Sequence, residues 1–117
     1  MNIAIDLDGT IDSFPCVFQS AMSALVAAGH LVYIVTGCDS PTVGKSDVSA
    51  KVGYLTALGI SPQCYTQLIV VPEPHPQNKA KVVKDNDITL IVDNKKATVK
   101  LVAEQCAALL LWNSKEP

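Results

Sequence analysis

Short apolar runs alternate with segments of helical spacing along the chain, and this alternation limits the fold more than any other feature. The apolar runs, which predict strands, are residues 2–6, 31–35, 67–71, 88–92 and 107–112. Helical spacing predicts helices over residues 14–28, from 46 or 47 to 58, over 78–84 and over 95–106. Because the strands are continuously apolar rather than alternating, both of their faces should be covered. The pattern predicts an α/β fold with a parallel sheet between two layers of helices.

Length and composition predict one globular domain spanning residues 1–117. The chain has 117 residues, of which 49% are hydrophobic, which suits one packed core. Its net charge of −2, with both signs mixed along the chain, gives no electrostatic footprint for nucleic acid. Neither a signal peptide nor an apolar stretch long enough to span a bilayer is visible, so we expect a cytoplasmic protein that is not associated with membranes. The four cysteines match neither a CxxC metal pair nor a disulfide framework, which favours a reduced compartment.

Polar residues follow three of the predicted strands at the point where each strand ends. They are Asp6 and Asp8, Thr36 and Gly37, and Asp93 and Asn94. The carboxyl ends of parallel strands meet at one edge of a sheet, which is where such folds bind ligands. Two carboxylates as close as Asp6 and Asp8 repel each other and favour a cation between them. We therefore expect a metal-assisted active site at this edge rather than a merely polar turn.

Four short motifs in this order resemble those of the haloacid dehalogenase superfamily. They are "DLDGT" at residues 6–10, "VTG" at 35–37, a lysine within "NKAKVVK" at 78–84, and the apolar strand that ends in Asp93. The resemblance implies a Rossmann-like three-layer sandwich with the strand order 5-4-1-2-3. It also implies an Mg²⁺-dependent phosphomonoester hydrolase that works through an aspartyl phosphate. The spacing of the motifs has no room for an inserted cap domain, so the chain resembles the capless subgroup.

The resemblance assigns roles to the residues of the first two motifs. Asp6 would be the nucleophile that attacks phosphorus, and Asp8 would protonate the leaving group and then activate water. An acid at position 8, where the dehalogenases have tyrosine, favours a phosphatase. Thr36 and the amide of Gly37 would hold the phosphoryl oxygens. The turn residues assigned to substrate binding are Gly9 and Thr10.

The resemblance also requires a lysine that balances the charge of the transferred group. Lys79 matches the family pattern best, because it lies near the start of the predicted helix and precedes an alanine. Lys81 is the second candidate. For Lys84 we expect a solvated helix face.

Mg²⁺ is the expected cofactor. By the same resemblance its ligands are Asp6, Asp8, Asp93 and Asn94. The family normally has a second acid where this chain has Asn94, and an amide adds no charge. This departure favours the alternative of a catalytically weak or inactive phosphate-binding or interaction domain.

Two other phosphate-related classes fit the sequence less well. "VGKS" at residues 43–46 lacks the earlier glycine of a P-loop, because residue 39 is Asp. A receiver domain would carry its phosphoacceptor after the third strand, which here ends at Val71 and Pro72. The expected partner is a phosphorylated substrate, either a small molecule or the end of a macromolecule. The apolar run at residues 107–112 could also support a homo-oligomer.

Overall fold

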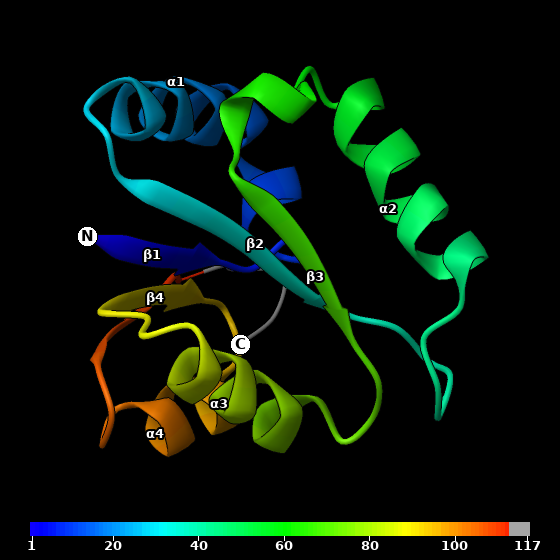
Figure 1. The fold of residues 1–117 in the computed structure, drawn as a ribbon, viewed down its shortest axis with the longest axis vertical. Coiled ribbons are helices and arrows are strands. Elements are labelled where there is room, and N and C mark those ends of the chain that lie inside the picture. The colour runs from blue at the N-terminus through cyan, green and yellow to red at the C-terminus, as the bar shows by residue number, and fades with distance from the viewer. Residues whose placement is uncertain (113–117) are drawn as a thin grey trace.

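The five apolar runs form one parallel sheet (Figure 1). The computed structural model describes residues 1–112 of the chain. Its strands are β1 (Asn2–Ile5), β2 (Leu31–Gly37), β3 (Gln67–Val71), β4 (Leu90–Asp93) and β5 (Ala107–Leu110). The strand order is β3-β2-β1-β4-β5, and every neighbouring pair is parallel. The predicted α/β class and the predicted strand order are both confirmed.

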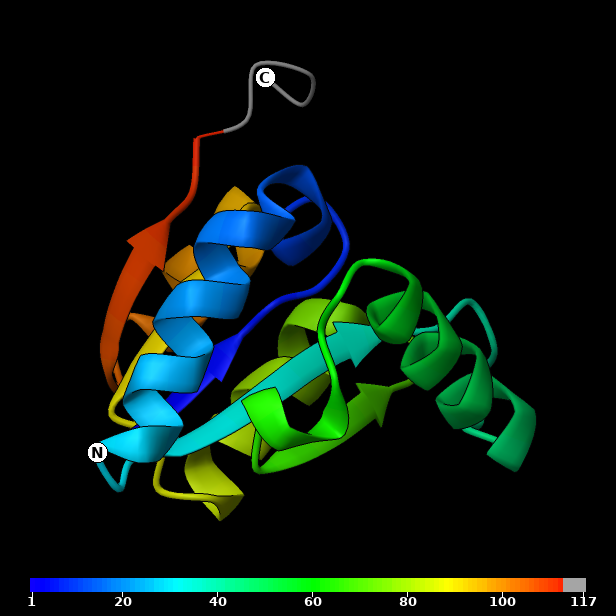
Figure 2. The same ribbon diagram turned by 90° about the horizontal axis from the view of Figure 1, so that it is seen from above.

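Helices cover both faces of the sheet. They are α1 (Pro15–Ala27), α2 (Lys45–Ala57), α3 (His75–Asp85) and α4 (Lys96–Val102), with short 3-10 turns η1 (Ile11–Ser13) and η2 (Pro62–Cys64). In Figure 1, α1 and α2 lie on one side of the sheet, and α3 and α4 lie on the other. Figure 2 looks down on the first of these faces and shows α2 on the side of β3, with β5 at the opposite side.

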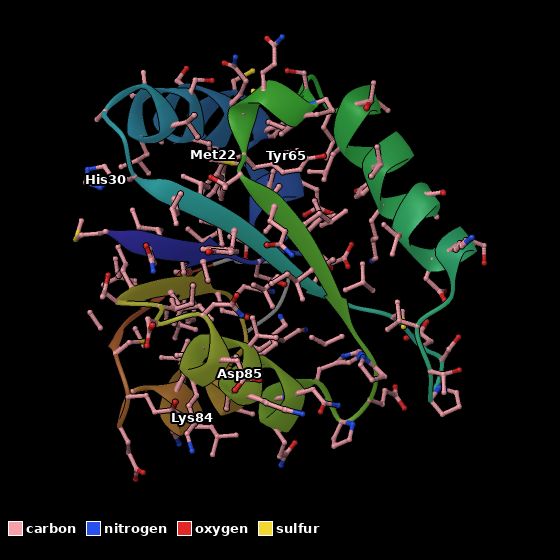
Figure 3. The ribbon with its side chains drawn as sticks, viewed as in Figure 1. Met22, His30, Tyr65, Lys84 and Asp85 are labelled. Carbon is pink, nitrogen blue, oxygen red and sulfur yellow. The ribbon has the colours of Figure 1, made fainter. Side chains whose placement is uncertain are left out.

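The core has two halves because neighbouring residues of a strand point to opposite faces. Ile5 and Ile34 contribute to the half that also contains Met22 of α1 and Leu55 of α2. Figure 3 labels Met22 and Tyr65 on this side of the sheet. The other half contains Ala4, Val35 and Ile91 from the strands, packed with Val83 of α3 and Val102 of α4. Burial on both faces is the physical reason for the continuous apolar runs.

Two helices differ in extent from the predicted ranges. Helix α3 begins at His75 rather than at residue 78, and Pro76 lies in its first turn, where a proline costs no hydrogen bond. Helix α4 ends at Val102 rather than at residue 106. Among residues 1–112, none of the helices has the length and apolar character needed to cross a membrane. The predicted domain also includes residues 113–117, which lie outside the described part of the chain.

Candidate functional site

A buried lysine joins the carboxyl ends of β1 and β4. Lys79 of α3 places its Nζ 2.8 Å from Asp6 Oδ1 and 2.8 Å from Asp93 Oδ2. Asp6 follows β1 directly, and Asp93 is the last residue of β4. The chain leaves these neighbouring strands toward opposite faces, through α1 and α4, so a crevice opens between their carboxyl ends. Asp6 and Lys79 line this crevice, and Asp93 is fully buried beside them.

Two carboxylates share one ammonium group in this cluster, and all three side chains are buried. Burial is the largest influence on Asp6, and it raises the pKa of that carboxyl to about 6 despite the opposing effect of Lys79. Burial alone would lower the pKa of Lys79, but the charges of Asp6 and Asp93 outweigh it and hold that pKa above its usual value. The carboxyl of Asp6 therefore takes up a proton closer to neutral pH than an ordinary aspartate does, while Lys79 stays protonated.

Asp8 is much more exposed than the three residues of this cluster. Its side chain is 55% exposed, whereas that of Asp6 is 5% exposed. Asp8 Oδ2 accepts a hydrogen bond from Thr36 Oγ1 at 3.1 Å and contacts Lys51 Nζ at 2.7 Å. Lys51 comes from α2, and sequence reasoning missed it because a single lysine on a helix gives no signal that separates it from a solvated residue.

The turn after β1 is fixed by close packing against Asn94. Gly9 has a φ of +83°, and a Cβ added there would lie 2.2 Å from Asn94 Nδ2. Only glycine fits this position without displacing Asn94. Thr10 is fully buried, and its Oγ1 lies 3.1 Å from Asp6 Oδ2 and 3.4 Å from Asn94 Oδ1. Thr10 therefore links the carboxylate of Asp6 to the side chain of Asn94.

These elements enclose a cleft with a volume of about 810 Å³. Among its lining residues are Asp6, Asp8, Gly37, Lys51, His75 and Lys79. The His75 ring packs so closely on Gly37 that a Cβ on this glycine would lie 2.6 Å from the ring. His75 Nε2 donates a hydrogen bond to the Cys38 carbonyl at 2.7 Å, which holds the wall of the cleft in place.

The structure distinguishes among the residues proposed from the sequence. Of the candidate lysines it brings Lys79 into the cluster, whereas Lys81 and Lys84 are exposed on α3. Figure 3 labels Lys84 on the outer side of this helix. Asp93 and Asn94 are buried, and neither is among the residues that line the cleft.

Within residues 1–112, no group of three or more His, Cys, Asp or Glu side chains is arranged to hold a metal ion. The ammonium of Lys79 occupies the position between Asp6 and Asp93 where a cation would neutralise both. Asp93 Oδ1 also accepts a hydrogen bond from the backbone N–H of Lys95 at 2.9 Å. All four cysteines are free thiols.

Comparison with known proteins shows similarity at the level of fold. The sequence matches no protein-family profile and no curated protein. A universal stress protein in complex with cAMP has a TM-score of 0.62 and 15% identity, with 97% of this chain and 98% of that chain covered. The universal stress protein from Archaeoglobus fulgidus in complex with dAMP has a TM-score of 0.57 and 17% identity, covering 96% and 98%. An uncharacterized protein from Corynebacterium glutamicum has a TM-score of 0.64 and 14% identity, covering 97% and 86%.

These neighbours correct the family prediction. The similar structures include universal stress proteins, a different fold family from the haloacid dehalogenase superfamily. The predicted superfamily, its capless subgroup, the phosphatase activity and the classification as an enzyme were wrong. The physical reason is that "DLDGT" follows β1, while "VTG" and Asp93 form the carboxyl ends of β2 and β4. A Rossmann-like sheet gathers polar residues at this edge, so their presence there does not distinguish one family from another.

Proposed function

We propose that this protein binds a nucleotide, as its Mg²⁺ complex, in the cleft at the carboxyl edge of the sheet. The observation that carries this proposal is the set of charged groups around the opening between β1 and β4. Ammonium groups of Lys51 and Lys79 lie beside the carboxylates of Asp8 and Asp6 in the same cleft. The proposal concerns binding and requires no chemical step.

The size of the cleft suits a small molecule. Its volume of about 810 Å³ falls within the range of roughly 300–1,000 Å³ that is typical of ligand pockets. Parts of its wall are already fixed by the contacts of His75 with Gly37 and Cys38. A nucleotide could therefore enter without a large rearrangement of the sheet.

The charges in the cleft favour Mg²⁺ together with the phosphate. Carboxylates outnumber ammonium groups among the lining residues, which include Asp6, Asp8, Asp39 and Asp47 against Lys51, Lys79 and Lys95. A bare phosphate would be repelled by this excess of negative charge. Mg²⁺ is commonly held by one or two carboxylates plus phosphate oxygens, and it neutralises part of the phosphate charge when bound. The half-exposed carboxylate of Asp8 would hold the ion, because the two oxygens of buried Asp6 already accept hydrogen bonds from Lys79 and Thr10.

The choice of a nucleotide over other phosphorylated compounds rests on the fold neighbours. Two of the similar structures are complexes of universal stress proteins with adenine nucleotides, namely cAMP and dAMP. Their identity to this chain is 15% and 17%, so they support the class of ligand by analogy of fold.

Calorimetric titration of AMP, with and without Mg²⁺, tests the proposal. We expect binding of AMP in the presence of Mg²⁺, weaker binding without it, and little binding of adenosine or of Mg²⁺ alone. Asp8→Asn should weaken the Mg²⁺-dependent binding. The matched control is Asp85→Asn, because Asp85 is exposed at the end of α3, before β4, on the opposite edge of the sheet. Equal AMP affinity with and without Mg²⁺, or equal effects of the two substitutions, would contradict the proposal.

A further inference from the structure

Two polar side chains on one face of α2 contact a segment that is distant in the sequence. Leu55 is the one buried residue among Lys45–Ala57. Lys51 and Tyr54 lie three positions apart, so they share a face of the helix. Both reach the segment that follows β1: Lys51 Nζ contacts Asp8 Oδ2 at 2.7 Å, and Tyr54 OH donates to Asp12 Oδ2 at 2.7 Å.

Asp12 connects this helix to the turn that carries Asp8. Its Oδ1 accepts a hydrogen bond from the backbone N–H of Gly9 at 2.7 Å, while its Oδ2 accepts the one from Tyr54. One carboxylate therefore fixes both the turn and the helix. The hydrogen bond to Asp12 is the main cause that raises the pKa of Tyr54 to about 12, so the phenol remains a donor at neutral pH.

Lys51 lies in the cleft with its ammonium group directed at an exposed carboxylate. The Lys51 side chain is 20% exposed, and that of Asp8 is 55% exposed. An ammonium group has three N–H donors, and the contact with Asp8 uses one of them. Lys51 is therefore placed to contact a ligand oxygen next to Asp8 without giving up its present partner.

We propose that Lys51 binds the phosphate of the ligand and that Tyr54, acting through Asp12, is a positioning residue that holds Lys51 in the cleft. This inference rests on the proposed nucleotide binding and identifies the side chain that would contact the phosphate. It also assigns a role to α2, which brings the ammonium group of Lys51 to the turn after β1, although the two segments are far apart in the sequence.

Calorimetric titrations of Lys51→Met, Tyr54→Phe and the double variant with AMP, in the presence of Mg²⁺, test the assignment. We expect Lys51→Met to weaken AMP binding by about tenfold, the value of one hydrogen bond to a charged group. Tyr54→Phe should weaken it by about threefold, less than Lys51→Met, because Tyr54 does not contact the ligand itself and acts only through the position of Lys51. In the Lys51→Met background, Tyr54→Phe should have no further effect, because Tyr54 acts through Lys51. Lys45→Met is the control, since Lys45 lies on the same helix but is not among the cleft-lining residues.

The salt dependence of AMP binding separates loss of the Lys51 charge from a general loss of structure. Removal of Lys51 should flatten the decrease of AMP affinity with rising salt, and Lys45→Met should leave it unchanged. If the native protein binds AMP and Lys51→Met binds it equally well, the assignment of Lys51 is overturned while the proposed function stands. If Tyr54→Phe costs as much in the Lys51→Met background as alone, the positioning role is overturned. If the native protein binds no AMP, both the function and the assignment fail.

Discussion

Substitution of Lys79 by methionine should be the most destabilising single change at the carboxyl edge of the sheet. The Lys79 side chain is 6% exposed, and its Nζ lies 2.8 Å from Asp6 Oδ1 and 2.8 Å from Asp93 Oδ2. Methionine has a similar length but removes the charge and both hydrogen bonds. Two carboxylates would then remain buried without a compensating cation. Each hydrogen bond to a charged group contributes about 1.5–3 kcal/mol, and breaking a buried ion pair costs about 3–5 kcal/mol in total.

That loss is a large part of the stability of a typical domain, which is about 5–15 kcal/mol. Urea denaturation at pH 7, followed by circular dichroism, measures the free energy of unfolding of both proteins. Lys81→Met is the matched control, because Lys81 is two residues away on α3 and is exposed. A surface substitution of this kind should change the free energy of unfolding by less than about 0.5 kcal/mol.

The deficit of Lys79→Met should also depend on pH. Without the ammonium group, the pKa of Asp6 rises further, because the cation that opposes the effect of burial is gone. Protonation removes the buried charge, so the deficit should be smaller at pH 5 than at pH 8. A loss below about 1 kcal/mol, or a deficit that is the same at both pH values, would refute the idea that Lys79 stabilises the protein by neutralising buried carboxylates.

In the native protein, burial raises the pKa of Asp6 from 3.8 to about 6, so the folded state binds this proton more tightly than the unfolded state does. The free energy of unfolding should therefore fall by about 3 kcal/mol as the pH rises from about 4 to about 6. Urea denaturation across this pH range should show that slope, and Asp6→Asn should flatten it; an unchanged slope would contradict the assignment. Gly9→Ala should destabilise the protein by about 2 kcal/mol, because residue 9 has a positive φ and the added Cβ would collide with Asn94. Gly53→Ala should instead stabilise it by about 0.5–1 kcal/mol, because Gly53 lies within α2 and its added Cβ would meet nothing within 4 Å. Thermal denaturation compares the two, and equal effects would show that the turn tolerates a side chain. Leu109 is 56% exposed on the edge strand β5, so the native chain should sediment as a dimer and Leu109→Lys as a monomer; a monomeric native chain would contradict the predicted homo-oligomer.

The sequence by itself determined the class of fold. Continuous apolar runs require cover on both faces, and helical segments between them supply it, so the parallel sheet followed from local pattern. The strand order was expected from the family resemblance and is confirmed, although the family was wrong. Local pattern also placed Asp6, Asp8 and Thr36 together, because the carboxyl ends of parallel strands share one edge.

Tertiary structure decided which charged groups meet at that edge. The sequence favoured Lys79 over Lys81, but only the packing of α3 shows its ammonium between Asp6 and Asp93. Nothing near Lys51 in the sequence indicates that α2 carries it to Asp8, 43 residues away along the chain. Local sequence specifies strands and helices through hydrogen bonds and periodicity over a few residues. A site assembled across several elements depends on how those elements pack, which motifs of a few residues do not specify.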